Sequence, residues 1–363
     1  MKSKLLLCAC LLLSCVTTSA SAATREYWIS AEKVDWDYAP SGENQMHPEM
    51  GMGIWGYQTT YKKYRYLQYS DASFSQPVEQ PAWMGMLGPQ IRAEEGDTIK
   101  VHFYNKADKP LSIHPHGVHY DKNNEGAGMH GEPGSAVKPG EKYTYTWTAD
   151  SGSAPGPSDP SSIVWAYHSH VDSVTEIYDG LIGSIVITKK GMTRSESDPR
   201  PKDVDREFTT MFMIFDENGR EAVPIATTKN GMHERHHSER DMHRMAGGGE
   251  FVELSDEQKE ESNLKHAING YIFANLPGLE AKKNEKVRWY LLGMGTEVDL
   301  HTAHWHGETV LENGRRTDVV ELLPTSMKTV DMIADNAAEE WMFHCHVTDH
   351  ITAGMTALWK VSP

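Results

Sequence analysis

Short runs of β-branched and aromatic residues, separated by turn-forming residues, are the main pattern along the chain. Examples are residues 98–104 (TIKVHFY), 142–147 (KYTYTW) and 286–291 (KVRWYL). Runs of this length and composition predict β-strands. No long amphipathic helix is evident, and residues 255–265 are the best candidate for a short one. We therefore expect an all-β fold built from β-sandwiches.

Two sandwiches are expected because the sequence repeats itself. LGPQIRAEEGDTIKVHFYN in the first half leads to HPHG at His114. LPGLEAKKNEKVRWYLLG in the second half leads to HWHG at His304. Further along, WAYHSHVDS in the first half matches WMFHCHVTD in the second. An internal repeat of this kind predicts two copies of one structural unit.

The segment between the two halves is charged and contains prolines. Residues 189–206 read KKGMTRSESDPRPKDVDR, a composition typical of a linker. We therefore place the first domain at residues 24–188 and the second at residues 207–363.

The first 23 residues are typical of a secretory signal peptide. Two lysines precede an apolar run at residues 5–16, and small residues follow it. The run is too short to span a bilayer as a helix of the mature chain. We expect cleavage after Ala22 and export to the periplasm or the extracellular space. Cys15 ends a lipobox-like LLSC, so a lipoprotein anchored through Cys15 is the alternative.

Composition and charge exclude several classes of protein. The chain has 363 residues, with 35 basic and 51 acidic side chains and a net charge of −16. This acidic balance argues against nucleic-acid binding and favours the attraction of cations. A mean hydropathy of −0.56 excludes a polytopic membrane protein, and 39% apolar residues argues against a disordered chain.

Histidine, methionine and cysteine point to metal chemistry. The chain has 19 histidines, 18 methionines and 4 cysteines. Cleavage after Ala22 would leave Cys345 alone, so no disulfide can form within the mature chain. A lone thiol in an oxidising compartment is a liability unless a metal binds it, and imidazole with thioether ligands favours copper.

Cys345 lies between two histidines in the sequence HCHVTDHITAGM. Successive side chains of a strand point to opposite faces, so His344 and His346 face one way and Cys345 the other. One tripeptide can therefore contribute ligands to two metal sites on opposite sides of a sheet and connect them through a short covalent path.

On the cysteine side, the spacing predicts a blue-copper electron-transfer site. His350 and Met355 follow in a turn that can fold back toward Cys345, and His301 begins HTAHWHG. Two histidines, one cysteine and a weak axial methionine are the ligands of such a site. A buried cysteine flanked by core histidines is the alternative interpretation. The expected ligands are His301, Cys345, His350 and Met355.

On the other side, four His-x-His pairs occupy repeat-matched positions. Both histidines of each pair lie on one face of a strand, so eight imidazoles are available, enough for three copper ions. The pairs are His114/His116, His168/His170, His304/His306 and His344/His346.

These motifs, together with YLQYSDASF, HAINGYIFANLPGL and VRWYLLGMGTEVDLHTAHWHG, resemble the multicopper oxidases, and among them the ceruloplasmin and hephaestin group. The resemblance implies Greek-key cupredoxin domains, four coppers per chain, and reduction of O₂ to water by one-electron oxidations of substrate. It assigns the type 2 copper to His114 and His304. It assigns the type 3 pair to His116, His168, His170, His306, His344 and His346.

The first half departs from this pattern. Ser169 stands where a cysteine would lie, and Leu111, Val174 and Asp179 stand where the other blue-copper ligands would lie. One blue copper per chain is therefore expected, in the second domain. Because each domain carries half of the cluster ligands, the cluster must form where the two kinds of domain meet. If they meet between chains, the contact is heterologous and closes into a ring. The resemblance to six-domain relatives implies three chains of two domains, so we expect a homotrimer.

The resemblance also implies a substrate. In ceruloplasmin-like ferroxidases, acidic residues and a histidine beside the blue copper hold Fe²⁺, and oxygen ligands with one imidazole suit Fe²⁺ or Mn²⁺. Glu297 would come from a neighbouring chain in the trimer. Each of these residues has an ordinary alternative as a solvated or turn residue. The matching positions are Glu261, His266, Asp349 and Glu297.

Other activities stay open from the sequence. Laccase-like oxidation of phenols or aromatic amines, and oxidation of Mn²⁺ or Cu⁺, are alternatives for the substrate. A copper carrier needs only the blue-copper ligands, and a copper nitrite reductase needs far fewer interface histidines. The histidine- and methionine-rich residues 229–249, and the group Met46, His47, Met50 and Met52, could bind copper or be ordinary loops.

Overall fold

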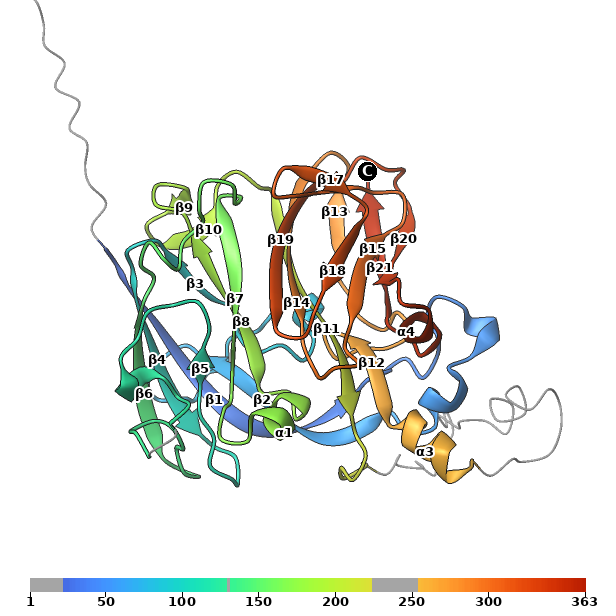
Figure 1. Ribbon diagram of the computed structural model, residues 1–363, viewed down its shortest axis with the longest axis horizontal. Helices are drawn as coiled ribbons and strands as arrows, with labels where there is room; N and C mark the ends of the chain where they lie inside the picture. The colour runs from blue at the N-terminus through green and yellow to red at the C-terminus, as the bar shows by residue number, and fades with distance from the viewer. Residues whose placement is uncertain (1–21, 129–130, 224–253) are drawn as a thin grey trace, which may run out of the picture.

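The computed structural model describes residues 22–128, 131–223 and 254–363 (Figure 1). Cys15, most of the expected signal peptide and the loop at 229–249 lie outside the described residues. Within the described part, no helix is long and apolar enough to cross a membrane.

The first sandwich consists of two four-stranded sheets. In one, β1 runs parallel to β4 and antiparallel to β2. The strands of this outer sheet, in order, are β2 (Thr60–Tyr69), β1 (Thr24–Asp37), β4 (Thr98–Asn105) and β6 (Lys142–Thr148). The strands of the inner sheet are β3 (Ile91–Glu94), β8 (Ile182–Thr188), β7 (Ser162–His168) and β5 (His114–Pro115).

The second sandwich repeats this plan with more strands. β11 runs parallel to β14 and antiparallel to β12. The inner sheet contains β12 (Leu264–Ile268), β11 (Arg206–Asp216), β14 (Lys286–Gly293), β19 (Ser326–Ile333), β16 (Val310–Glu312) and β17 (Arg315–Thr317). The outer sheet contains β13 (Glu280–Lys282), β21 (Thr356–Ser362), β20 (Glu340–Cys345), β15 (His301–Trp305) and β18 (Val319–Leu322).

Short helices occupy the connections. The expected helix near residue 255 is present as α3 (Asp256–Ser262), and Ser255 caps its N-terminus through a capping box with Gln258. The others are α1 (Ser173–Tyr178), α4 (Thr348–Thr352), η1 (Pro48–Met50), η2 (Gly53–Gly56), η3 (Ala82–Met84) and η4 (Lys122–Asn124).

The four sheets stack as successive layers across the molecule (Figure 1). One apolar core fills each sandwich, the first around Trp147 and the second around Trp289. A third cluster, here named the junction core, lies between the two inner sheets. It joins Val164 and Ala166 of β7 to Tyr290 and other residues of β11 and β14. Both inner sheets are therefore buried on both faces, which holds the two sandwiches together as one body.

The expected all-β, two-sandwich fold is confirmed, and the three strand runs at 98–104, 142–147 and 286–291 lie in β4, β6 and β14. The segment expected as a linker is more ordered than its composition suggests. It forms a two-stranded ladder of β9 (Thr193–Ser195) and β10 (Asp198–Pro201). The exact domain boundaries stay a prediction.

Candidate metal centres

The side chains expected to form a blue-copper site lie together inside the second sandwich. Cys345 Sγ is 3.5 Å from His350 Nδ1 and 3.9 Å from His301 Nδ1, and the two imidazole nitrogens are 3.2 Å apart. A trigonal metal bonded at about 2.0–2.3 Å places its ligand atoms roughly 3.5–3.9 Å apart. The site therefore has nearly the separations that a His₂Cys copper centre needs, without rearrangement of the backbone.

Local structure explains this convergence. Cys345 ends β20 and points into the core, while β15 beside it brings His301 to the same side. The turn of α4 carries His350 back, as the spacing predicts. Met355 is fully buried, and its carbonyl accepts a 3.1 Å hydrogen bond from the Cys345 N–H.

Asp299 is a further candidate residue of this site, which the sequence did not predict. Its Oδ1 is 3.1 Å from His301 Nε2, and the carboxylate is fully buried. Asp299 also accepts hydrogen bonds from the backbone N–H groups of Ile214 at 2.7 Å and Thr296 at 2.8 Å. A carboxylate in this position holds the imidazole so that its other nitrogen faces the metal. The i, i+2 spacing of Asp299 and His301 in DLH is the signal that could have found it.

The charges of this site favour metal binding. Burial by itself raises the pKa of the Cys345 thiol, but hydrogen bonds with His301 and His350 outweigh it and lower the pKa to about 6. Burial by itself lowers the pKa of His301, but Asp299 and Cys345 outweigh it and raise the pKa above its ordinary value. The cysteine is therefore poised to become the thiolate that copper binds.

Four of the remaining histidines gather on the outer face of the second sandwich. His344 Nε2 lies 3.1 Å from both His304 Nδ1 and His306 Nε2, and the His346 ring is 5.0 Å from the His304 ring. His344 alternates with Phe343 and Cys345, which point into the core, so it faces outward as expected. We name this group the second half-cluster: His304, His306, His344 and His346.

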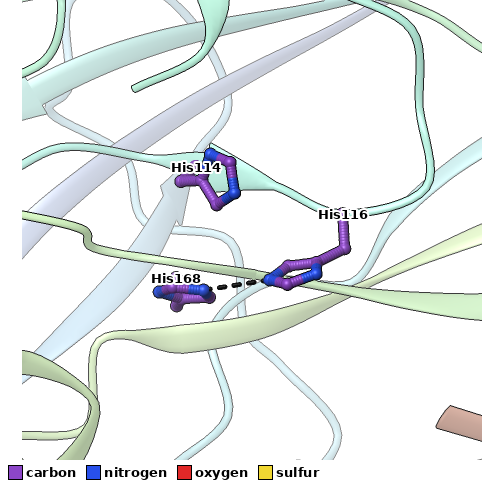
Figure 2. Close-up of side chains that lie close together, drawn as sticks. All are labelled: His114, His116 and His168. Carbon is purple, nitrogen blue, oxygen red and sulfur yellow. Dashed lines mark hydrogen bonds between the residues drawn. The ribbon is translucent and has the colours of Figure 1, made fainter. Parts of the chain in front are cut away.

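The repeat-matched histidines of the first sandwich form an equivalent group, three of which are drawn in Figure 2. His116 Nε2 is 3.0 Å from His168 Nε2, and the His170 ring is 5.0 Å from the His114 ring. We name this group the first half-cluster: His114, His116, His168 and His170.

Backbone hydrogen bonds orient the rings of both half-clusters. His168 Nδ1 lies 2.8 Å from the Ser169 carbonyl, and His344 Nδ1 lies 2.7 Å from the Cys345 carbonyl. His114 Nδ1 is likewise 2.7 Å from the Glu125 carbonyl. A proton on Nδ1 leaves Nε2 free as a ligand.

The imidazoles are also held in the neutral form that binds metal. Burial, helped by neighbouring imidazoles, lowers the pKa of His116 and His344 to about 4. Burial, again helped by neighbouring imidazoles, lowers the pKa of His168 to about 3. These groups are therefore unprotonated at neutral pH and ready to accept a cation.

The two half-clusters lie on different layers. His168 shares the face of β7 that carries Val164 and Ala166 toward the junction core. His304 and His344 lie on the outer sheet of the second sandwich, on the face opposite its core. Among the described residues, each close group of candidate ligands takes its histidines from one sandwich alone.

The position that matches Cys345 in the first sandwich is occupied differently. Ser169 is fully buried, and its Oγ accepts a 3.0 Å hydrogen bond from the Ser112 N–H. Leu111 packs in the first core, Val174 is exposed, and Asp179 pairs with Lys109 and Arg220. None of these four side chains is a cysteine, histidine or methionine, so the first sandwich has no counterpart of the blue-copper ligands.

Three of the four residues expected at a substrate iron site lie beside the blue-copper site. His266 Nε2 on β12 is 3.8 Å from Glu261 Oε1 at the end of α3. The His266 ring lies 5.1 Å from the ring of His350, and Asp349 directly precedes that residue. Burial raises the pKa of Glu261, and the charge of Asp349 raises it further.

His266 itself has an unusual environment. Its side chain is only 8% exposed, and neither ring nitrogen has a hydrogen-bond partner among the described residues. Buried polar groups normally have partners, so an unpaired imidazole that faces a carboxylate is suited to a cation. Glu297 lies on the exposed turn before β15, near Tyr178 of α1, and its role stays a prediction.

Comparison with known proteins agrees with this geometry. Residues 67–191 and residues 250–363 each match a family model described as multicopper oxidase. The chain is 36% identical to hephaestin from Rattus norvegicus, covering 99% of this chain and 31% of the relative. It is 37% identical to the ferroxidase HEPHL1 from Homo sapiens, over 93% of this chain and 29% of that protein. It is 35% identical to human ceruloplasmin, over 99% of this chain and 33% of that protein.

The chain spans about a third of the length of these curated relatives. Among solved structures, it is similar to the multicopper oxidase mgLAC, with a TM-score of 0.60 and 20% identity, covering 93% of this chain and 86% of that one. A blue copper oxidase from Nitrosomonas europaea gives a TM-score of 0.56 at 20% identity, covering 93% and 86% of the two chains. At about 20% sequence identity, the similarity to these two structures shows a shared fold only.

Proposed function

Because the chain belongs to the multicopper oxidase family, we propose that it is a ferroxidase, which oxidises Fe²⁺ and reduces O₂ to water. The balanced reaction takes four Fe²⁺, one O₂ and four protons to four Fe³⁺ and two water molecules. Four bound coppers per chain would supply the electron transfer and the O₂ chemistry. The curated relatives, one of them named a ferroxidase, support this choice.

The observation that carries the choice of iron is the unpaired, buried His266 beside Glu261. A hydrated Fe²⁺ would gain one imidazole and the oxygens of Glu261 and Asp349, ligands that suit this metal. Carboxylates stabilise Fe³⁺ more than Fe²⁺, so the site favours the loss of an electron. That electron has a short path, because His266 lies against His350.

The chain's own residues divide the work between the two faces of β20. His301, Cys345 and His350 would hold the copper that accepts the electron, with Met355 beside them. From Cys345 the path to the histidines of the second half-cluster runs through one peptide unit on each side. His344 and His346 lie directly next to Cys345 in the chain.

The arrangement of the half-clusters supports assembly of several chains. The histidines of the second half-cluster lie on the outermost sheet, facing away from the first sandwich of the same chain. A complete cluster of eight imidazoles therefore needs the first half-cluster of another copy. Such a contact is heterologous and can close into a ring. Because the chain spans about a third of the length of its curated relatives, we propose that the ring is a homotrimer. A fully active monomer in analytical ultracentrifugation would overturn the trimer.

The substrate is tested by steady-state O₂ consumption of the copper-loaded protein with Fe²⁺, Mn²⁺, Cu⁺ and a phenol, side by side. Glu261→Ala and His266→Ala should each lower kcat/KM for Fe²⁺ by at least about tenfold, which corresponds to about 1.4 kcal/mol. Both variants should keep the blue absorbance and the phenol rate. Glu257→Ala, on the exposed side of α3, is the matched control.

The outcomes separate the alternatives. Normal Fe²⁺ oxidation by both Glu261→Ala and His266→Ala would refute the iron site. A phenol rate that exceeds the Fe²⁺ rate would favour a laccase-like oxidase. Metal analysis that finds one or two coppers per chain, rather than about four, would favour a carrier or a nitrite reductase.

A further inference from the structure

A cavity of about 370 Å³ lies at the junction of the two domains. It is formed where the connection between β2 and β3 meets the β9–β10 ladder and the start of β11, and β10 packs beside β3 and β8 (Figure 1). None of its lining residues is a proposed ligand of copper or iron. Small-molecule sites typically have volumes of about 300–1,000 Å³ and often lie between domains. The cavity therefore has a suitable size and position for a small ligand.

One part of the lining is apolar and contains two aromatic rings. Trp83 of η3 and Phe208 of β11 contact each other edge to face, with ring centroids 5.4 Å apart. Phe208 is buried, whereas Trp83 is half-buried, so part of the indole surface is available for contact with a ligand. An aromatic ligand can pack on this surface. The apolar lining residues are Val78, Pro81, Trp83, Met84, Pro89 and Phe208.

The other part of the lining is basic. It contains four arginines and three carboxylates, an excess of one positive charge, although the chain as a whole carries a net charge of −16. This local excess favours an anionic ligand over a cationic one. The arginines are Arg92, Arg194, Arg200 and Arg206, and the carboxylates are Glu79, Asp205 and Glu207.

Arg194 differs from the other three arginines in its partners. Each of the other three forms an ion pair with a carboxylate at 2.6–2.8 Å. Arg194 instead donates to the backbone carbonyls of Pro201 at 3.2 Å, Val204 at 3.0 Å and Asp205 at 3.4 Å. Within the described part of the chain these are its only hydrogen bonds, and its Nη1 makes none. The carbonyls hold the guanidinium in place without neutralising its charge, so Nη1 is available to bind the carboxylate of a ligand.

We propose that this cavity binds a small aromatic carboxylate, with the carboxylate on Arg194 and the ring against Trp83. The site is separate from the proposed ferroxidase chemistry and does not depend on it. A ligand of this class uses both parts of the lining, whereas inorganic phosphate would use only the arginines and a neutral ring only the apolar residues. Because the cavity is lined by both domains and by the ladder, bound ligand should stabilise their junction.

The test is isothermal titration calorimetry of the full, copper-loaded protein with 2-naphthoate as the probe. We expect one site per chain with a Kd below about 1 mM. Two analogues separate the parts of the site: 2-naphthamide keeps the rings without the charge, and acetate keeps the charge without the rings. Each should bind at least about tenfold more weakly, because the first loses the charged hydrogen bonds and the second the ring contact. Saturating 2-naphthoate should also raise the midpoint temperature of unfolding.

Two variants locate the site. Arg194→Gln should weaken 2-naphthoate binding about tenfold and leave 2-naphthamide binding unchanged, while Trp83→Ala should weaken the binding of both probes. The matched control is Arg316→Gln. Arg316 is, like Arg194, exposed on a short strand, where it donates a 2.7 Å hydrogen bond to Thr309 Oγ1, but it does not line the cavity. This variant should bind 2-naphthoate as the wild-type protein does.

Several results would overturn the proposal. One is the absence of 2-naphthoate binding at millimolar concentration, and another is equal binding by Arg194→Gln and the wild-type protein. Equal weakening by Arg316→Gln would show a general effect of charge instead of a site. Displacement of the probe by an equal concentration of inorganic phosphate would show that the cavity binds any anion, which also contradicts recognition of an aromatic carboxylate.

Discussion

Asp299→Asn should weaken the blue-copper site and the fold of the second domain together. The carboxylate is fully buried and accepts three hydrogen bonds, which Oδ1 receives from Ile214 and His301 and Oδ2 from Thr296. Asparagine has nearly the same shape but carries one acceptor oxygen. If that oxygen keeps its contacts with Ile214 and His301, the new NH₂ group faces the Thr296 N–H. Both groups are hydrogen-bond donors, so the Thr296 N–H loses its acceptor.

The expected magnitude follows from these contacts. A buried donor left without an acceptor costs about 1–3 kcal/mol, and replacing a charged acceptor by a neutral one costs about a further 1 kcal/mol. We therefore expect the free energy of unfolding of the copper-free protein to fall by about 2–4 kcal/mol. Loss of the carboxylate that orients His301 should also weaken copper binding by about 10- to 100-fold.

Urea denaturation of the copper-free protein measures the first effect, and loss of blue absorbance to a chelator measures the second. Asp318→Asn is the control, because that carboxylate lies 3.9 Å from His304 Nε2 but is 62% exposed. Its unfolding free energy should change by at most about 0.5 kcal/mol. If Asp299→Asn and Asp318→Asn behave alike in both assays, the reasoning about the buried carboxylate is refuted.

Three further predictions concern other parts of the molecule. In the copper-free protein, burial lowers the pKa of His168 from 6.5 to about 3. As the pH falls below 6.5, the unfolded chain therefore takes up a proton before the folded protein does, and the free energy of unfolding should decrease. In urea denaturation at several pH values, His168→Gln should show a weaker dependence of this free energy on pH. Cys345→Ser should abolish the blue absorbance and lower the copper content by about one per chain, and a variant that stays blue would contradict the ligand assignment. Lys63→Met should leave its buried partner Glu217 without a counter-ion and destabilise the protein by about 3–5 kcal/mol in urea denaturation. The adjacent Lys62→Met, at an exposed pair, should cost less than about 1 kcal/mol.

The parts of this structure that depend on neighbouring residues in the chain were predictable. Alternation along β20 placed Cys345 and His344 on opposite faces, since a strand has a period of two whatever surrounds it. The helix α3 was predictable for a similar reason, because its cap and its first turn are adjacent in sequence. The repeated His-x-His pairs gave the half-clusters because both members of each pair come from one short segment.

The parts that depend on packing between distant segments were not predictable. The spacing of Asp299 and His301 in DLH hints at their pairing, but the burial of the carboxylate depends on Ile214, a residue 85 positions away. The Trp55 carbonyl of η2 accepts a hydrogen bond from Lys265 of β12, 210 positions away, so no local pattern near either residue shows this contact. The ladder of β9 and β10 was not evident from its charged, proline-containing composition, because its polar side chains are largely at the surface and Arg200 pairs with Asp198 within β10.

The junction core has a consequence for how copies can associate. Since the two inner sheets pack against each other through one buried apolar layer, the two sandwiches of a chain hold a fixed relative orientation, with one half-cluster on each sandwich. In a ring that joins the first half-cluster of one chain to the second half-cluster of the next, the angle between the two sandwiches of each chain determines how many copies close the ring. Substitutions at Tyr290, a junction-core residue that is not among the proposed ligands, should therefore change the number of subunits by changing this angle.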